Sequence, residues 1–313
     1  MMTDNIQRAA ALLRANQLVA FPTETVYGIG GNALSDDAVA AIYAVKQRPE
    51  FNPLIVHVRT LADAEQYAQF NDAARTLAKH FWPGPLTLVV RRKENCALSL
   101  LVSAGLDCVA LRSPAHKLAQ ALLRESALPI AAPSANRSGR ISPTEATHVR
   151  EELGDRIPMV LDGGPCPIGI ESTVIDMTGD IPIILRPGSV TEADIRCQIS
   201  DVSTVACHLT SDIRSPGQLV SHYAPSLPLR LNATEVGKDE ALLAFGNPLS
   251  GAYAMENLSM NGDLQEAAAN LFRMLRRLDA SGAKRIAAMP IPEEGLGIAI
   301  NDRLKRAAAP RGN

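Results

Sequence analysis

The run from Leu18 to His57 constrains the fold most, because it places a strand, a helix and a second strand within about forty residues. Leu18–Phe21 is a short apolar stretch, and residues 36–47 have the apolar spacing of an amphipathic helix with two acids at its start. Leu54–Val58 is an apolar stretch of strand type that delivers His57. Such a unit buries its apolar faces in layers, so the chain is predicted to be an α/β protein.

Short strands and helices continue to alternate up to residue 200. Strands are predicted at Leu86–Arg91, Cys108–Leu111, Pro129–Ala132, Met159–Leu161, Ser172–Asp176 and Ile183–Leu185. Helices are predicted at 5–16, 61–68, 72–80, Pro114–Arg124 and 191–199. We expect residues 1–200 to form one domain, in which helices pack against a sheet.

Residues 201–227 have weak periodicity and are predicted to be a linker. They contain two turns fixed by proline, Ser215-Pro216-Gly217-Gln218 and His222-Tyr223-Ala224-Pro225. A plain spacer is usually rich in Gly and Ser or charged, so a spacer and a functional segment fit this stretch about equally well.

Alternation resumes in residues 228–313. Strands are predicted at Leu229–Leu231, Leu242–Phe245, Ala254–Leu258 and Arg285–Met289, and helices at Asp263–Ala280 and Gly297–Ala308. This order predicts a small second α/β domain with a largely parallel sheet.

Composition excludes several classes of protein. The formal net charge of −2 argues against a protein that grips nucleic acid mainly by releasing counterions. The five cysteines form no C-x-x-C pair, so a zinc knuckle or a dithiol site is not expected, and their scatter is typical of a reducing cytoplasm. We find no signal peptide pattern, and no segment approaches the ~18 apolar residues of a membrane span.

Several common catalytic motifs are absent. The chain lacks G-x-x-x-x-G-K-[ST], G-x-G-x-x-G and H-E-x-x-H, and no G-x-S-x-G surrounds Ser134. A P-loop enzyme, a dinucleotide-binding fold, a serine hydrolase and an ordinary metalloenzyme are therefore not favoured, and no metal site held by the protein is predicted.

Cationic side chains gather at the ends of predicted elements: Lys46, Arg48, Arg112, Arg137 and Arg186. One arginine at a strand end is usually solvated, but several beside Gly, Ser and Asn turns suit a polyphosphate, which needs charge neutralisation and directed donors. Taken alone, the Ser134-Ala135-Asn136 turn fits a plain strand-to-helix connection equally well, and His57 fits a buried core histidine. The residues thus predict a cleft at the sheet ends that binds a phosphorylated or otherwise anionic small molecule.

Eight segments in one order resemble the YrdC-type threonylcarbamoyl-AMP synthases: Phe21–Gly28, Lys46–Pro49, Asn52–His57, Trp82–Thr87, Ala132–Gly139, Leu161–Gly164, Glu171–Asp176 and Leu185–Gly188. The linker motifs and the second α/β domain resemble the long, two-domain form of that family. The resemblance implies a YrdC-like twisted mixed sheet flanked by helices for residues 1–200. It further implies a linker or lid over the active site for 201–227 and a Rossmann-like domain for 228–313.

The family's reaction joins L-threonine, bicarbonate and ATP into threonylcarbamoyl-AMP, with release of diphosphate and water. By resemblance, L-threonine is held by Thr25, His57, Arg112, Ala132 and Ser172. ATP is held by Lys46, Arg48, Asn52, Cys108, Ser134, Asn136, Ser142, Arg186 and Tyr223, and Lys46 and Arg48 are the catalytic candidates. Mg²⁺ is expected to arrive with ATP and to be held mainly by its phosphates.

Two positions depart from the family pattern. Cys108 stands where many relatives have threonine, and Ser221 stands where arginine is common. The expected downstream partner is a transferase complex that modifies tRNA position 37 in a transient encounter, without strong direct binding of nucleic acid by this chain. The alternative, from another class, is a YrdC-like RNA-binding module without catalysis. A carbamoyl-adenylate-forming domain of hydrogenase-maturation type would usually bring zinc-finger pairs, which this chain lacks.

Overall fold

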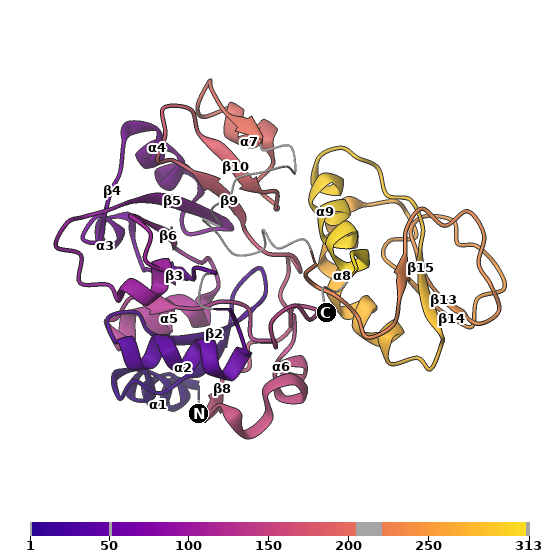
Figure 1. Cartoon of the computed structure of the whole chain (residues 1–313), viewed down its shortest axis with the longest axis horizontal. Helices are drawn as coiled ribbons and strands as arrows, with labels where there is room; N and C mark the ends of the chain where they lie inside the picture. Colours follow the sequence, from indigo (N-terminus) through magenta and orange to yellow (C-terminus); the bar gives the residue numbers. More distant parts are fainter. Residues whose placement is uncertain (1, 50–51, 205–220, 311–313) are drawn as a thin grey trace.

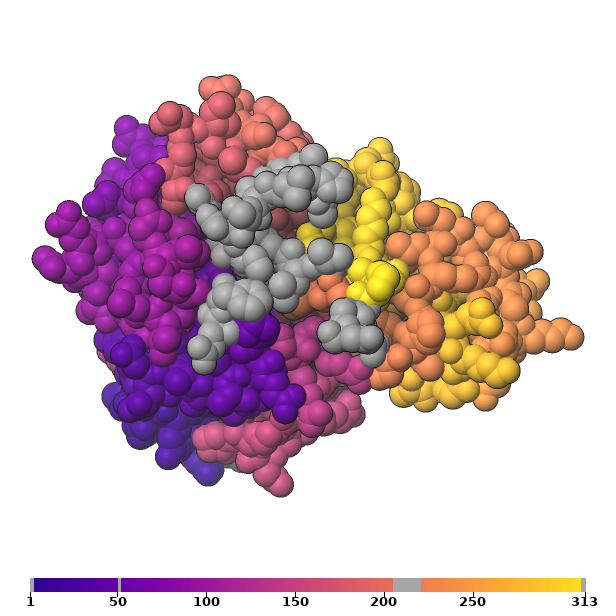
Figure 2. All heavy atoms as spheres, in the orientation of Figure 1, coloured from indigo at the N-terminus to yellow at the C-terminus, as the bar shows by residue number. Residues whose placement is uncertain are grey.

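The computed structural model describes residues 2–49, 52–204 and 221–310. Figure 1 shows two bodies: one from indigo to salmon, and one in orange and yellow. Figure 2 shows the second body beside the first in a space-filling view. The core of the predicted linker, residues 205–220 with Ser215-Pro216-Gly217-Gln218 and Cys207, lies outside the described residues.

The first body contains one large mixed sheet with the strand order β11-β10-β9-β5-β6-β3-β7-β2-β1-β8, and β4 pairs with β5. The strands are β1 (Val19–Pro22), β2 (Tyr27–Asn32), β3 (Ile55–His57), β4 (Ala68–Gln69), β5 (Leu86–Arg92), β6 (Cys108–Arg112), β7 (Ile130–Ala131), β8 (Met159–Val160), β9 (Thr173–Asp176), β10 (Ile183–Arg186) and β11 (Ser203–Thr204). The helices are α1 (Met2–Arg14), α2 (Asp36–Lys46), α3 (Leu61–Ala64), α4 (Asp72–Phe81), α5 (Lys117–Ser126), α6 (Ala146–Leu153) and α7 (Glu192–Arg196), with 3-10 turns η1 (Leu100–Ser103) and η2 (Gly154–Arg156). Parallel and antiparallel pairs coexist, so the predicted α/β class with a mixed sheet is confirmed.

The second body carries a sheet of order β12-β15-β13-β14. Its elements are β12 (Leu229–Arg230), β13 (Glu240–Ala244), β14 (Ala254–Asn257), α8 (Leu264–Asp279), β15 (Arg285–Ala288) and α9 (Leu296–Ala308). All of its strand pairs are parallel, as predicted. Helices α8 and α9 lie between this sheet and the first body (Figure 1).

Three short strands differ from the sequence interpretation: β2, β4, which begins at the end of the predicted helix 61–68, and β11, which lies in the predicted linker 201–227. No strand is predicted for the glycine-rich segment after Val26, but Tyr27–Asn32 forms β2, which pairs with β1 and β7. A Cβ at Gly30 would lie 2.7 Å from Phe21 Cε1 and 2.8 Å from Ile130 Cγ2. These glycines therefore bring neighbouring side chains close to the strand rather than breaking it. The predicted helices at 61–68 and 191–199 are also shorter, at Leu61–Ala64 and Glu192–Arg196.

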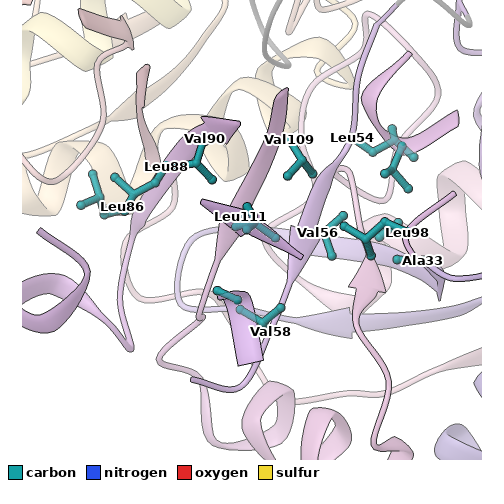
Figure 3. Packing of buried hydrophobic residues seen from close by; sticks show 14 of the residues in the cluster. Ala33, Leu54, Val56, Val58, Leu86, Leu88, Val90, Leu98, Val109 and Leu111 are labelled. Atoms are coloured by element: carbon teal, nitrogen blue, oxygen red, sulfur yellow. The ribbon is translucent and has the colours of Figure 1, made fainter. Parts of the chain in front are cut away.

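The main apolar core lies on one face of the large sheet. Val56 of β3, Leu88 of β5 and Leu111 of β6 belong to it, and Figure 3 shows them with their neighbours. Because successive strand residues point to opposite faces, this pattern sends the residues next to them, including His57 and Arg112, to the other face. Within the described ranges, none of the helices is both long and apolar enough to cross a membrane.

Candidate active site

A narrow cleft lies on the sheet face opposite the main core, with a cavity volume of ≈ 40 Å³. It is lined by residues of the β1–β2 turn, the ends of β3, β6 and β10, the segments beside β7 and β9, and the chain entering the second body. These are Thr23, Thr25, Val26, Gly28, Arg48, Ile55, His57, Arg112, Ala132, Pro133, Ser134, Glu171, Ser172, Arg186, His222 and Tyr223. Polar groups from distant parts of the chain thus meet in one cleft.

The five residues predicted to hold L-threonine all line this cleft: Thr25, His57, Arg112, Ala132 and Ser172. Strands β7, β3 and β6 are neighbours in the sheet, which brings three of them side by side. Their hydroxyl, imidazole, guanidinium and backbone groups converge as a small polar ligand requires.

Arg112 is already partly occupied by protein groups. Its Nη2 lies 2.5 Å from Glu24 Oε1, its Nη1 donates to Thr25 Oγ1 at 2.9 Å, and its Nε donates to Gly84 O at 3.1 Å. Both members of the Arg112–Glu24 ion pair are buried. Of the five guanidinium N–H groups, the two left over sit on Nη1 and Nη2. A ligand carboxylate can therefore reach at most these two N–H groups of the arginine.

His57 is a neutral imidazole at physiological pH. Burial, followed by the nearby Arg112 charge, lowers the pKa of His57 to about 3. Its ring meets Phe21 edge to face with the centroids 6.1 Å apart, and its Nδ1 has no hydrogen-bond partner within the described part of the chain. An unpaired ring nitrogen beside a cleft is available to a ligand.

The Lys46–Arg48 end of the cleft has a different charge environment. Lys46 Nζ donates to Ser134 O and Asn136 O, both at 2.5 Å, and to Asn136 Oδ1 at 3.3 Å. Arg48 donates to Asn52 O at 3.1 Å and to Pro53 O at 3.0 Å. All of these acceptors are neutral. Burial and the charge of Arg48 hold the pKa of Lys46 well below its usual range, and burial lowers the pKa of Arg48 to about 10. Because no negative charge balances these two cations, a bound anion would stabilise their charged forms.

Arg186 and Ser172 connect the two ends of the cleft. Arg186 donates from Nε to Ser172 O and from Nη2 to Ser172 Oγ, each at 3.1 Å. Ser172 Oγ also lies 2.8 Å from Thr87 Oγ1. The hydroxyl predicted to contact L-threonine is thus oriented by an arginine predicted to contact ATP.

The residues predicted to contact ATP fall into two groups. Arg48, Ser134, Arg186 and Tyr223 line the cleft, whereas Lys46, Asn52, Cys108, Asn136 and Ser142 lie behind its wall. Asn136 Nδ2 donates to Arg140 O at 2.7 Å, which holds the turn that Lys46 also ties down. Cys108 packs in a small apolar cluster with Ile55, Ala110 and Val174.

The buried amide of Asn52 has neither its nitrogen nor its oxygen paired in the described residues, although it does not line the cleft. Arg137, also noted among the cations, is exposed.

Sequence reasoning missed three charged residues of the site: Glu24, Glu171 and Arg303. Glu24 pairs with Arg112, and Glu171 accepts from Ser142 Oγ at 2.5 Å and from Arg303 Nε at 2.9 Å. The sequence could have indicated Arg303, because it lies on the apolar face of its predicted helix, beside Ile300 and Leu304. An arginine at such a position has to be paired with something inside the protein.

No cluster of three or more His, Cys, Asp or Glu side chains suited to a metal ion occurs among the residues that the structure describes. Both carboxylates that border Arg112 and Ser142 are engaged by protein donors: Glu24 by Arg112 and Ala115 N, and Glu171 by Ser142 and Arg303. The donors of this cleft are suited to anionic oxygens rather than to a cation.

Comparison with known proteins covers nearly the whole chain. Residues 11–188 match the family model Sua5_yciO_yrdC, described as "Telomere recombination", and residues 190–309 match "Threonylcarbamoyl-AMP synthase, C-terminal domain". The Threonylcarbamoyl-AMP synthase of Bacillus subtilis is 43% identical over 98% of this chain and 93% of its own length. The Pyrococcus abyssi protein of the same name is 41% identical over 98% and 94%.

A solved structure agrees with these sequence matches. The crystal structure of Pyrococcus abyssi Sua5 complexed with L-threonine superposes with a TM-score of 0.91 at 38% identity. The match covers 98% of this chain and 94% of that one, so both bodies and their arrangement are shared.

Proposed function

The chain belongs to the threonylcarbamoyl-AMP synthase family, and on that premise we propose that it converts L-threonine, bicarbonate and ATP into threonylcarbamoyl-AMP, diphosphate and water. It is an ATP-dependent enzyme of the nucleotidyltransferase type. The product feeds threonylcarbamoyladenosine formation at tRNA position 37. The comparisons give no support to the alternative of an RNA-binding module without catalysis.

The observation that carries the proposal is the contrast in charge along one cleft. Lys46 and Arg48 are buried against neutral oxygens, whereas Arg112 is balanced by Glu24. A triphosphate brings several negative charges and suits the first environment. A zwitterionic amino acid brings none net and suits the second.

In the threonine subsite, we assign the carboxylate to the two remaining N–H groups of Arg112. The Ala132 backbone and the hydroxyls of Thr25 and Ser172 supply further polar contacts around the amino acid, and neutral His57 offers Nδ1. This assignment rests on the shared lining of the cleft and on the family resemblance.

The chemistry proceeds in two steps. The threonine amine attacks bicarbonate to form a carbamate, and water leaves. A carbamate oxygen then attacks the α-phosphorus of ATP, and diphosphate departs in line. Catalysis of this type depends on positioning and charge neutralisation, which we assign to Lys46, Arg48 and Arg186. Both the carbamate and the mixed anhydride are labile in water, so enclosure of the cleft has a chemical purpose.

We propose that Mg²⁺ enters as part of the MgATP substrate and is held by phosphate oxygens, because the donors lining the cleft are cations and hydroxyls. We also propose the domain limits 1–200, 201–227 and 228–313, a cytoplasmic location and a transient encounter with the downstream tRNA-modifying transferase. The two family matches meet at residues 188–190, close to the first of these limits.

The test is diphosphate release from ATP by the purified full chain. We expect release only when both L-threonine and bicarbonate are present, with threonylcarbamoyl-AMP detected by mass spectrometry. Omission of either substrate provides the control. Release that ignores threonine would contradict the proposal.

A further inference from the structure

Arg303 belongs to α9 of the second body, yet its side chain is fully buried. Taking a guanidinium out of water is costly unless charge and hydrogen bonds replace the water. Its partners therefore show what this burial achieves.

The partners of Arg303 lie in both bodies. Nε donates to Glu171 Oε2 at 2.9 Å, across 132 positions of sequence, and Nη1 donates to the adjacent Asp302 at 2.7 Å. The guanidinium carbon lies 5.4 Å from the centroid of the Tyr223 ring, a cation–π distance. Arg303 is thus a bridge between the second body and two residues that line the cleft.

Glu171 transmits this contact toward the substrate groups. Its other oxygen accepts from Ser142 Oγ at 2.5 Å. The next residue, Ser172, is held by Arg186 through both its carbonyl and its hydroxyl. A shift of Glu171 would therefore displace Ser142 and, through Ser172, Arg186, which are both predicted to contact ATP.

Tyr223 depends on the second body even more directly. Its backbone has φ of 63°, a left-handed conformation that is unfavourable for a non-glycine residue. Its ring packs on Phe272 of α8 with the centroids 5.4 Å apart, and the preceding His222 N–H donates to Arg306 O of α9 at 3.2 Å. Its hydroxyl has no partner among the residues the structure describes. The surroundings therefore hold a strained residue whose hydroxyl is left for a ligand.

We propose that Arg303 is a positioning residue that fixes Glu171 and the Tyr223 ring at the ATP end of the cleft. The second body thereby completes the nucleotide site. This inference rests on the proposed synthase function. The predicted threonine contacts differ in origin, because Arg112 and its partners Glu24, Thr25 and Gly84 all belong to the first body. Loss of Arg303 should therefore weaken ATP binding more than threonine binding.

The experiment compares Arg303→Met with wild type in the full chain. Methionine keeps much of the length and removes the charge and the donors. We expect the KM for ATP to rise at least about tenfold, because a buried charge pair loses one partner. Threonine affinity, measured by calorimetry without ATP, should change less than the KM for ATP, because Arg112 and its partners are untouched and Ser172 is the one predicted threonine contact next to Glu171. Arg303→Lys keeps the charge but loses the planar set of guanidinium donors, so its KM for ATP should lie between those of wild type and Arg303→Met.

Lys305→Met is the matched control, because Lys305 is an exposed cation on the same helix, and its kinetics should equal wild type. Removing one partner of a buried pair can also unfold a protein. The double variant Arg303→Met with Glu171→Gln removes both charges and is measured in parallel. It should fold and show the same rise in the KM for ATP, because the Tyr223 ring still lacks its support.

An unchanged KM for ATP in a folded Arg303→Met protein would overturn the inference. An equal loss of threonine affinity would also overturn it, since that indicates general damage. Wild-type enzyme that releases no diphosphate with threonine and bicarbonate would instead overturn the proposed function itself.

Discussion

The two ends of the cleft handle buried positive charge in opposite ways. At one end, Arg112 forms an ion pair with Glu24, and both are buried. At the other end, Lys46 and Arg48 donate to backbone and amide oxygens that carry no charge. The first end is electrostatically complete without substrate, and the second becomes complete when an anion arrives. The difference assigns the amino acid to one end and the triphosphate to the other.

The two ends also differ in what supports them. The partners of Arg112 come from the first body alone, in the sheet and its loops. The nucleotide end is bordered by Tyr223, which contacts α8 and α9 of the second body. A site assembled from two bodies can respond to their relative position, whereas a site within one sheet cannot respond in that way.

The largest expected effect comes from Lys46→Met, which breaks the nucleotide end. We expect diphosphate release to fall by about 10²-fold, because Lys46 holds the Ser134–Asn136 turn at the wall of the cleft and a small misplacement of positioning groups is costly. Threonine binding should persist, because no threonine contact is altered. Turnover is measured together with circular dichroism, and Lys79→Met, at an exposed lysine, is the control. Turnover near the wild-type value in the folded variant would contradict the assignment of the triphosphate to the Lys46–Arg48 end.

A smaller effect is expected at the balanced end from Arg112→Lys. Lysine keeps the charge but cannot offer two parallel N–H groups, so the KM for L-threonine should rise by about 10–100-fold. The KM for ATP should change much less. Steady-state kinetics with each substrate varied in turn measure the ratio of the two effects. Arg91→Lys, on the neighbouring β5 and exposed, should leave both constants unchanged. A larger rise in the KM for ATP than in the KM for threonine would mean that the substrates assigned to the two ends of the cleft are the wrong way round.

The smallest effect concerns pH and the histidine at the balanced end. The pKa of His57 is about 3 in the folded chain against an ordinary value of 6.5. Between these values the unfolded chain binds a proton that the folded chain refuses, so stability falls as pH drops through this window. From pH 7 to pH 5 this histidine should account for about 2 kcal/mol of lost stability.

Urea unfolding of wild type and His57→Asn at pH 7 and pH 5 measures this loss. The variant should lose less stability than wild type over the interval, whereas His80→Asn, at an exposed position, should follow wild type. Parallel curves for wild type and His57→Asn would show that His57 titrates normally.

Much of the site was predictable from local signals. The alternation in β3 and β6 places His57 and Arg112 on the face opposite Val56 and Leu111, and their motifs matched a known family. The β2 strand was missed, because its glycines look like turn residues in a sequence. Only the packing of Phe21 and Ile130 beside Gly30 explains them.

The α/β class, most of the order of elements, the parallel second sheet and the chemical types at the strand ends could be predicted from the amino-acid sequence. These follow from periodicity and residue type over short windows. Only the tertiary structure decided which charges meet. Glu171 and Arg303 are 132 positions apart, and Arg112 and Glu24 are 88 apart. Their pairing depends on which surfaces pack together, and that is a property of the whole chain rather than of any local pattern.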